Sequence, residues 1–180
     1  AGDLLLPVAF SQLIAEEYTC DQQATLTKLL AKATSDMVIG QVYDTLGGLP
    51  EHLEPLEQLE EIHRNKTGAL ICCSCQMGAV CGNVSSEAYE AISSFGSAIG
   101  LMFQIVDDLI DLHGNAALVG KATGKDAEAG KITYPGTIGV EASKKSVREL
   151  QKQADNALQS LNFDTETLAS FNLWMAHRTR

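Results

Sequence analysis

Long stretches with few helix-breaking residues dominate this sequence. Its 180 residues include only four prolines, and the segments between the prolines and glycines are rich in Ala, Leu, Ile, Glu and Gln. These residues favour helices, whereas the sequence has no convincing alternation of polar and β-branched residues of the kind that marks strands. The pattern therefore predicts a single all-α domain over residues 1–180, with no internal repeat and no linker to a second domain.

The breaker residues also indicate where the helices begin and end. The expected helices span residues 3–18, 25–42, 55–80, 85–98, 99–112, 141–161 and 164–178. Residues 46–55 form an expected loop because they contain Gly47, Gly48 and Pro50. Residues 114–130 form a second expected loop, which is polar and contains several glycines, and an apolar pattern resumes over 133–139.

Charge and hydropathy exclude several functional classes. The chain has 13 Lys and Arg against 23 Asp and Glu, and this formal net charge of −10 argues against binding to nucleic acid. No apolar run is long enough to predict a membrane span, and no signal-peptide pattern is present.

Four of the five cysteines cluster at positions 72, 73, 75 and 81. The total of five cysteines is odd, and four of them are closely spaced; both features argue against a set of disulfides. Cys72 and Cys75 form a C-x-x-C pair, but no second pair of zinc ligands stands nearby. We therefore interpret these cysteines as small apolar core residues, and we expect a reducing, cytoplasmic location.

One helix carries a stripe of carboxylates. Gln104, Asp107, Asp108 and Asp111 stand at i, i+3, i+4 and i+7, which places them on one side of a helix that is otherwise apolar. A solvated face is the alternative interpretation. However, no Lys or Arg in the helix relieves the repulsion, and a divalent cation would do so. Mg²⁺, for which Mn²⁺ can substitute, typically binds one or two carboxylates together with substrate phosphates.

Basic residues follow this stripe and also precede it. Lys121, Lys125 and Lys131 lie in the glycine-containing loop, where lysines could neutralise a metal-bound diphosphate. Lys66 and Thr67 lie where a polar helix segment becomes apolar, and they could offer an ammonium group and a hydroxyl to a phosphate. A solvated loop and a polar helix junction remain the alternatives for these two segments.

Four segments in order resemble the trans-isoprenyl diphosphate synthases, the farnesyl and geranylgeranyl diphosphate synthase family. They are GQVYD (40–44), EEIHRNKTGALI (60–71), FQIVDDLID (103–111) and GKATGKDAEAGKITYP (120–135). The initial AGDLLLPVAF is similar to the helix that follows the family's first catalytic region. The resemblance implies an all-α bundle around a central cavity, which corresponds to the isoprenoid-synthase fold.

The resemblance also implies a role for each matching residue. Asp107, Asp108 and Asp111 resemble the metal-binding aspartates of the second aspartate-rich motif, and Asp126 resembles the aspartate that holds metal-bound water. Lys66, Lys121 and Lys131 resemble the lysines that bind the allylic diphosphate. Thr67 and Gln104 resemble residues beside the reacting carbons, so the implied catalytic set is Lys66, Thr67, Gln104 and Lys121. Gln41, Asp44 and Phe103 resemble further substrate-binding residues.

The implied activity is prenyl transfer, in which Mg²⁺-assisted loss of diphosphate from an allylic substrate is followed by attack of isopentenyl diphosphate. Asp107 and Asp108 are the only adjacent aspartates in the chain, so the family's first aspartate-rich motif is missing. The resemblance is therefore to the C-terminal portion of a synthase. A non-catalytic partner subunit and a terpene cyclase of the same fold are the alternatives. The family implies a homodimer, and the small residues over 85–100 are the expected seam, although they suit a contact within the chain equally well.

Overall fold

The computed structural model describes residues 2–118 and 132–178, and these residues form helices joined by short turns. The helices are α1 Gly2–Gln12, α2 Cys20–Leu46, α3 Pro55–His63, the π-helical segment η1 Arg64–Gly68, α4 Ala69–Cys81, α5 Ser86–Leu118, α7 Tyr134–Ile138, α8 Val140–Gln159 and α9 Glu166–His177. The described ranges contain no strand, which confirms the expected all-α fold.

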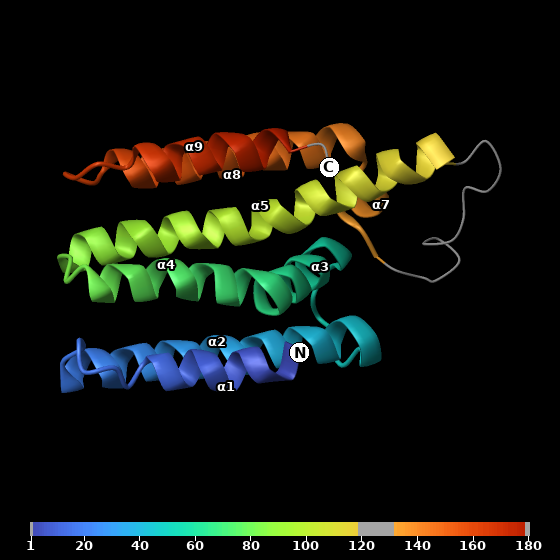
Figure 1. Ribbon diagram of the computed structural model, residues 1–180. Coiled ribbons are helices and arrows are strands. Elements are labelled where there is room, and N and C mark those ends of the chain that lie inside the picture. The colour runs from blue at the N-terminus through green and yellow to red at the C-terminus, as the bar shows by residue number, and fades with distance from the viewer. Residues whose placement is uncertain (1, 119–131, 179–180) are drawn as a thin grey trace.

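The long helices lie side by side in a layered bundle (Figure 1). Helices α1 and α2 form one outer layer, α8 and α9 form the opposite one, and α4 and α5 lie between them. The main contacts follow the same order, from α2 to α4, from α4 to α5 and from α5 to α8. Helix α5 is therefore the central element of the bundle.

Helix α2 begins earlier than its apolar pattern indicates. The Thr19 hydroxyl accepts a hydrogen bond from the backbone N–H of Gln22, and the Gln22 side chain accepts one from the backbone N–H of Thr19. This reciprocal capping box satisfies N–H groups that the first turn would leave free. The helix therefore begins at Cys20 rather than at residue 25, and it ends where Gly47 adopts a φ of 75°.

Helix α5 is one continuous helix, so the expectation of two helices over 85–98 and 99–112 is wrong. Gly100 lies inside the helix, where a glycine costs only about 1 kcal/mol relative to alanine. Its missing side chain lets η1 approach closely, because a Cβ on Gly100 would lie 2.6 Å from the Cα of Gly68. The glycine thus marks a helix contact rather than a helix end.

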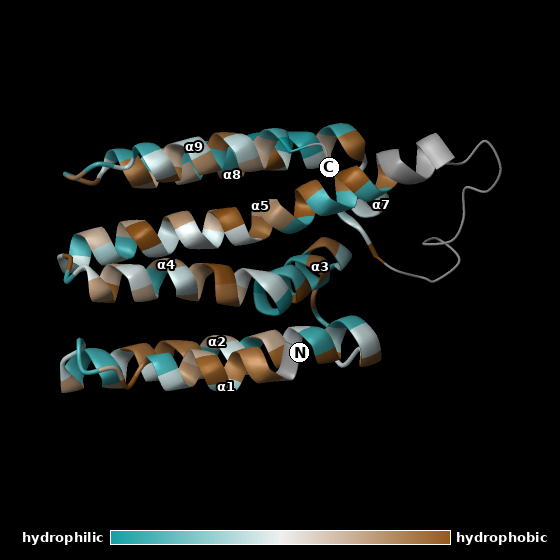
Figure 2. Ribbon diagram, in the orientation of Figure 1, coloured by the Kyte–Doolittle hydropathy of each residue, from teal (hydrophilic) through white to brown (hydrophobic). Residues whose placement is uncertain are grey.

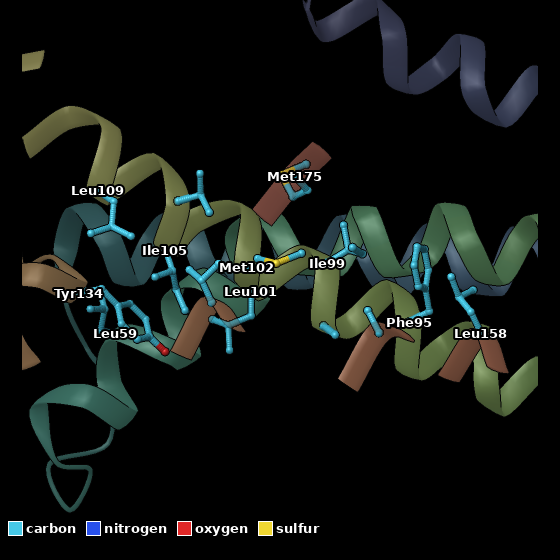
Figure 3. Close-up of a cluster of buried hydrophobic side chains, with 14 residues drawn as sticks. Leu59, Phe95, Ile99, Leu101, Met102, Ile105, Leu109, Tyr134, Leu158 and Met175 are labelled. Carbon is cyan, nitrogen blue, oxygen red and sulfur yellow. The ribbon is translucent and has the colours of Figure 1, made fainter. Parts of the chain in front are cut away.

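The main hydrophobic core surrounds α5 (Figure 3). Phe95, Ile99, Met102 and Ile105 of α5 are at most 1% exposed. They belong to a cluster completed by Leu59 of α3, Tyr134 of α7, Val147 and Leu158 of α8, and Met175 of α9. This core fixes the axial position of α5 and therefore the position of the carboxylates on it.

A second close approach joins α2 to η1. A Cβ on Gly40 would lie 2.2 Å from the backbone nitrogen of Lys66, so only glycine allows the two backbones to meet there. Gly40 therefore brings residues 41–44 of α2 next to Lys66.

Some of the small residues expected to form a dimer seam are used in contacts within the chain. Gly96, Ala98 and Gly100 are buried, and a Cβ on Gly96 would lie 2.9 Å from the Cα of Cys72 in α4. Exposed apolar residues include Leu5 of α1, Ile14 in the turn between α1 and α2, and Val38 of α2. Figure 2 shows hydrophobic stretches along both helices. No helix among the described residues is long and apolar enough to span a membrane.

Candidate functional site

The carboxylate stripe divides into an open part and a buried part. Asp107 has a side chain that is 40% exposed, and Asp111 is exposed as well. Asp108 is only 8% exposed. Residues 107 and 111 are four apart on the helix and share one face, whereas residue 108 is rotated by about 100° from residue 107. Of the three aspartates on the stripe, only Asp107 and Asp111 therefore offer carboxylate oxygens to a ligand from solvent.

Asp108 joins α5 to α3 and α7. Its Oδ2 accepts a hydrogen bond of 2.9 Å from the backbone N–H of Tyr134. The Nε2 of buried His63 lies 3.4 Å from the same oxygen, although the geometry is not that of a hydrogen bond. His63 also stacks on the Tyr134 ring, with 5.8 Å between the ring centroids. These contacts indicate that Asp108 anchors the polypeptide that enters α7.

The Tyr134 hydroxyl completes this buried group by donating a 2.6 Å hydrogen bond to Oε1 of Glu60. Burial raises the pKa of Tyr134, and the hydrogen bond to the Glu60 carboxylate raises it further. The hydroxyl therefore stays protonated and remains a donor over the physiological pH range. Glu60 and Tyr134 were not expected as partners, since 74 residues separate them and neither stands in a spacing pattern with the other.

Asp107 is paired with a cation from the end of the described chain. Nη2 of Arg178 donates to Oδ1 of Asp107, and the guanidinium lies 4.5 Å from the centroid of the Phe103 ring. Burial raises the pKa of Asp107, and the positive charge and hydrogen bond of Arg178 oppose that rise. The amide of Gln104 also lies 3.5 Å from Oδ2 of Asp107. Sequence reasoning missed Arg178 because its partner lies 71 residues away, on another helix.

A second pair of opposite charges lies where α2 meets η1. Nζ of Lys66 lies 2.6 Å from Oδ2 of Asp44, and both side chains are partly buried. Thr67 is also half-buried in the same turn, whereas Gln41 is exposed one turn before Asp44 on α2. The turn itself is π-helical, a geometry that is frequent at functional sites.

The two charged groups are linked through the glycine contact between η1 and α5. Gly68 follows Thr67 and packs on Gly100. Asp107 lies seven residues after Gly100, which is about 10 Å of helix rise. Lys66 and Asp107 therefore lie on directly packed elements. We expect Lys66 and Asp107 to converge with Lys121 on one cavity mouth. The structure does not test this expectation, because Lys121, Asp126 and Lys131 lie outside the described residues.

The donors present suit a hard divalent cation only in part. The described residues contain no group of three acidic, His or Cys side chains arranged to hold a metal ion. Asp107 and Asp111 supply carboxylate oxygens on one helix face, and Mg²⁺ commonly takes only one or two carboxylates, with water and substrate phosphates as its other ligands. The site therefore fits Mg²⁺ that arrives with a phosphate substrate, and it does not form a complete protein cage.

Comparison with known proteins gives a consistent match along the chain. The sequence profile of the family described as polyprenyl synthetase matches residues 1–167. The chain is 38% identical over 182 residues to geranylgeranyl pyrophosphate synthase 4 of Arabidopsis thaliana, covering 99% of this chain and 49% of that protein. It is 34% identical over 175 residues to farnesyl diphosphate synthase of Haemophilus influenzae, covering 94% and 58%.

A solved structure supports the same assignment. The geranyltransferase of Helicobacter pylori, crystallised with magnesium and isoprenyl diphosphate, superposes with a TM-score of 0.72 at 29% identity. The alignment covers 97% of this chain and 57% of that structure. The chain thus spans about half the length of the curated relatives that it matches.

Proposed function

The chain belongs to the polyprenyl synthetase family, and we propose that the protein carrying it is a prenyltransferase that condenses isopentenyl diphosphate with an allylic diphosphate. The observation that carries this proposal is the pairing of open carboxylates with nearby cations. Asp107 of α5 faces solvent beside Arg178. Lys66, on the adjoining turn η1, is held against Asp44 of α2. Such a site can bind a metal and the phosphates that accompany it.

Asp107 and Asp111 would hold Mg²⁺ in this proposal, with Mn²⁺ as a substitute. The bound cation supplies positive charge where negative charge grows on the departing diphosphate. Asp108 acts differently from its neighbours: its buried contacts to Tyr134 and His63 support a positioning role behind the metal site.

Lys66 would bind the diphosphate of the allylic substrate. The Asp44 carboxylate fixes its ammonium group at 2.6 Å, which limits the number of orientations that the side chain must lose when it binds phosphate. Thr67 and Gln104 carry oxygens that can stabilise the allylic cation, and Phe103 offers a ring next to Asp107. Gln41, Lys121 and Lys131 complete the proposed substrate-binding set, with Asp126 holding metal-bound water.

We further propose that two copies of the protein associate through α1 and α2. Leu5 of α1 is 70% exposed and Ile14, in the turn between α1 and α2, is 72% exposed, and a dimer contact would remove these apolar side chains from water. Two-fold dimers are the commonest assembly of soluble proteins. The free cysteines support the cytoplasmic location that the sequence predicts.

The decisive experiment is a condensation assay on the protein expressed at its full coding length. It would be incubated with labelled isopentenyl diphosphate, geranyl diphosphate and Mg²⁺, and the products would be dephosphorylated and identified by chain length. An extended prenyl alcohol that disappears with EDTA supports the proposal. A cyclic hydrocarbon would identify a terpene cyclase instead. Product formed only after addition of a second polypeptide would identify a partner subunit.

A further inference from the structure

A cavity of about 530 Å³ lies between the second half of α5, the first half of α8 and the end of α9. Its walls are largely apolar and include Val106, Leu109 and Ile110 of α5 and Val147 of α8. Ligand pockets of proteins commonly measure about 300–1,000 Å³ and are mostly apolar, with a few polar groups that fix orientation. The size and lining therefore suit a small organic ligand.

Apart from Gln151, the polar side chains at this cavity are basic. Lys144 and Arg148 contribute from α8, and His177 and Arg178 contribute from the end of α9, while no acidic residue among those that the structure describes lines the cavity. This concentration of positive charge occurs in a chain whose formal net charge is −10. The cavity between α2 and α4 differs, because Asp36 and Glu61 line it together with Lys28, Lys32 and Arg64.

The basic residues differ in how far other partners engage them. Arg178 is committed to Asp107 and Phe103. Lys144 contacts Glu141, whose side chain is 83% exposed, and exposed ion pairs of this kind contribute little free energy. Arg148 forms no ion pair with any residue in the described part of the chain. Lys144 and Arg148 stand four residues apart on one face of α8, so both can reach one anion at the cavity rim.

We propose that this cavity binds an anion that carries a hydrocarbon chain. Lys144 and Arg148 bind the head group, and the chain lies on the apolar side chains of Val106, Ile110 and Val147. The proposal needs both parts of the ligand, since the cavity offers positive charge at its rim and apolar surface in its interior. It does not rest on the proposed prenyl transfer, because none of these five residues is assigned to that reaction, although Arg178 at the same cavity pairs with Asp107.

The test uses probes with one hydrocarbon chain, added to the full-length protein below the concentrations at which the probes form micelles. Decanoate carries a carboxylate head group and decyl phosphate carries a phosphate head group. Decanol lacks the charge, and inorganic phosphate lacks the chain. Isothermal titration calorimetry should show binding of at least one of the two decyl anions, with decanol and inorganic phosphate at least tenfold weaker. The anion that binds with higher affinity identifies the head group of the ligand as a carboxylate or a phosphate.

Matched variants locate the binding. Arg148→Gln should weaken binding of the decyl anion roughly tenfold, because it removes a charged hydrogen-bond donor. Lys152→Gln removes the same charge from α8 but lines a different cavity, and it should leave the affinity unchanged. Ala176→Leu places bulk in the proposed cavity and should reduce binding, whereas Ala91→Leu, which lines the same cavity as Lys152, should not.

The proposal is overturned if neither decyl anion binds, or if decanol binds as tightly as the anions. It is overturned equally if Arg148→Gln and Lys152→Gln have the same effect. Circular dichroism of each variant establishes that it is folded, and Ala176→Leu then reports on the cavity even where a charge variant does not fold.

Discussion

At the scale of single residues, neighbouring aspartates on one helix have different surroundings. Asp107 is open to solvent and paired with Arg178, while Asp108 is buried against Tyr134 and His63. The rotation of one residue on a helix accounts for the difference. An adjacent pair of aspartates in a sequence therefore does not by itself identify two metal ligands.

The first prediction separates these roles by stability. Asp108→Ala should lower the free energy of unfolding by about 1–3 kcal/mol, because it leaves the buried N–H of Tyr134 without its acceptor. Asp111→Ala removes the same group at an exposed position and should change it by no more than about 0.5 kcal/mol. Urea denaturation measures both. Equal effects of the two variants would contradict the anchoring role of Asp108.

At the scale of secondary-structure elements, two glycine contacts set the geometry of the candidate site. Gly40 lets α2 meet η1 at Lys66, and Gly100 lets η1 meet α5 at Gly68. Lys66 lies at the first contact, Asp44 follows Gly40 on α2, and Asp107 follows Gly100 on α5. The distance between α2 and α5 at the site therefore depends on glycines.

A glycine pair tests this dependence. Gly40→Ala should destabilise the protein by about 1–3 kcal/mol, because the new Cβ would lie 2.2 Å from the backbone of Lys66 and force the helices apart. Gly78→Ala on α4 is the control: its Cβ would meet nothing within 4 Å, so it should stabilise the helix by about 0.5–1 kcal/mol. The two variants should change the free energy of unfolding, measured by thermal or urea denaturation, in opposite directions. A neutral Gly40→Ala would show that the contact does not hold α2 in place.

The helices and the charged motifs are predictable from sequence to different extents. Apolar periodicity and proline positions gave the fold class, and the start of α3 at Pro55 was correct. The expected boundary between residues 98 and 99 was wrong, because α5 continues through it and Gly100 packs against Gly68 from inside the helix. The Asp107–Arg178 and Glu60–Tyr134 contacts were unpredictable, because only tertiary packing brings such distant residues together.

At the scale of the whole molecule, apolar side chains are exposed on both outer layers: on α1 and α2, and also on α9, where Leu173 and Trp174 are more than half exposed. Leu5 and Ile14 belong to the exposed apolar surface of the layer formed by α1 and α2, whereas the small residues near 96–100 are buried inside the chain. The layer as a whole is therefore a stronger candidate for contact with a second copy than the segment over residues 85–100.

This assignment predicts how charge affects assembly. Leu5→Lys together with Val38→Lys should shift the protein toward a monomer, because charges on an apolar interface would have to lose their hydration. Gln12→Lys places a charge at an exposed polar position of the same layer and should leave assembly unchanged. Sedimentation equilibrium at micromolar concentration measures both. A monomeric unmodified protein would refute the assembly claim.

The central claim is that Asp107 binds the metal that assists loss of the diphosphate. Steady-state kinetics of Asp107→Ala in the full-length protein test it most directly, with Asp164→Ala, an exposed carboxylate far along the chain, as the control. A ligand of that metal acts mainly in the transition state, so kcat should fall by about 100-fold or more while KM changes much less. Asp164→Ala should remain near normal. A near-normal kcat for folded Asp107→Ala would contradict the account.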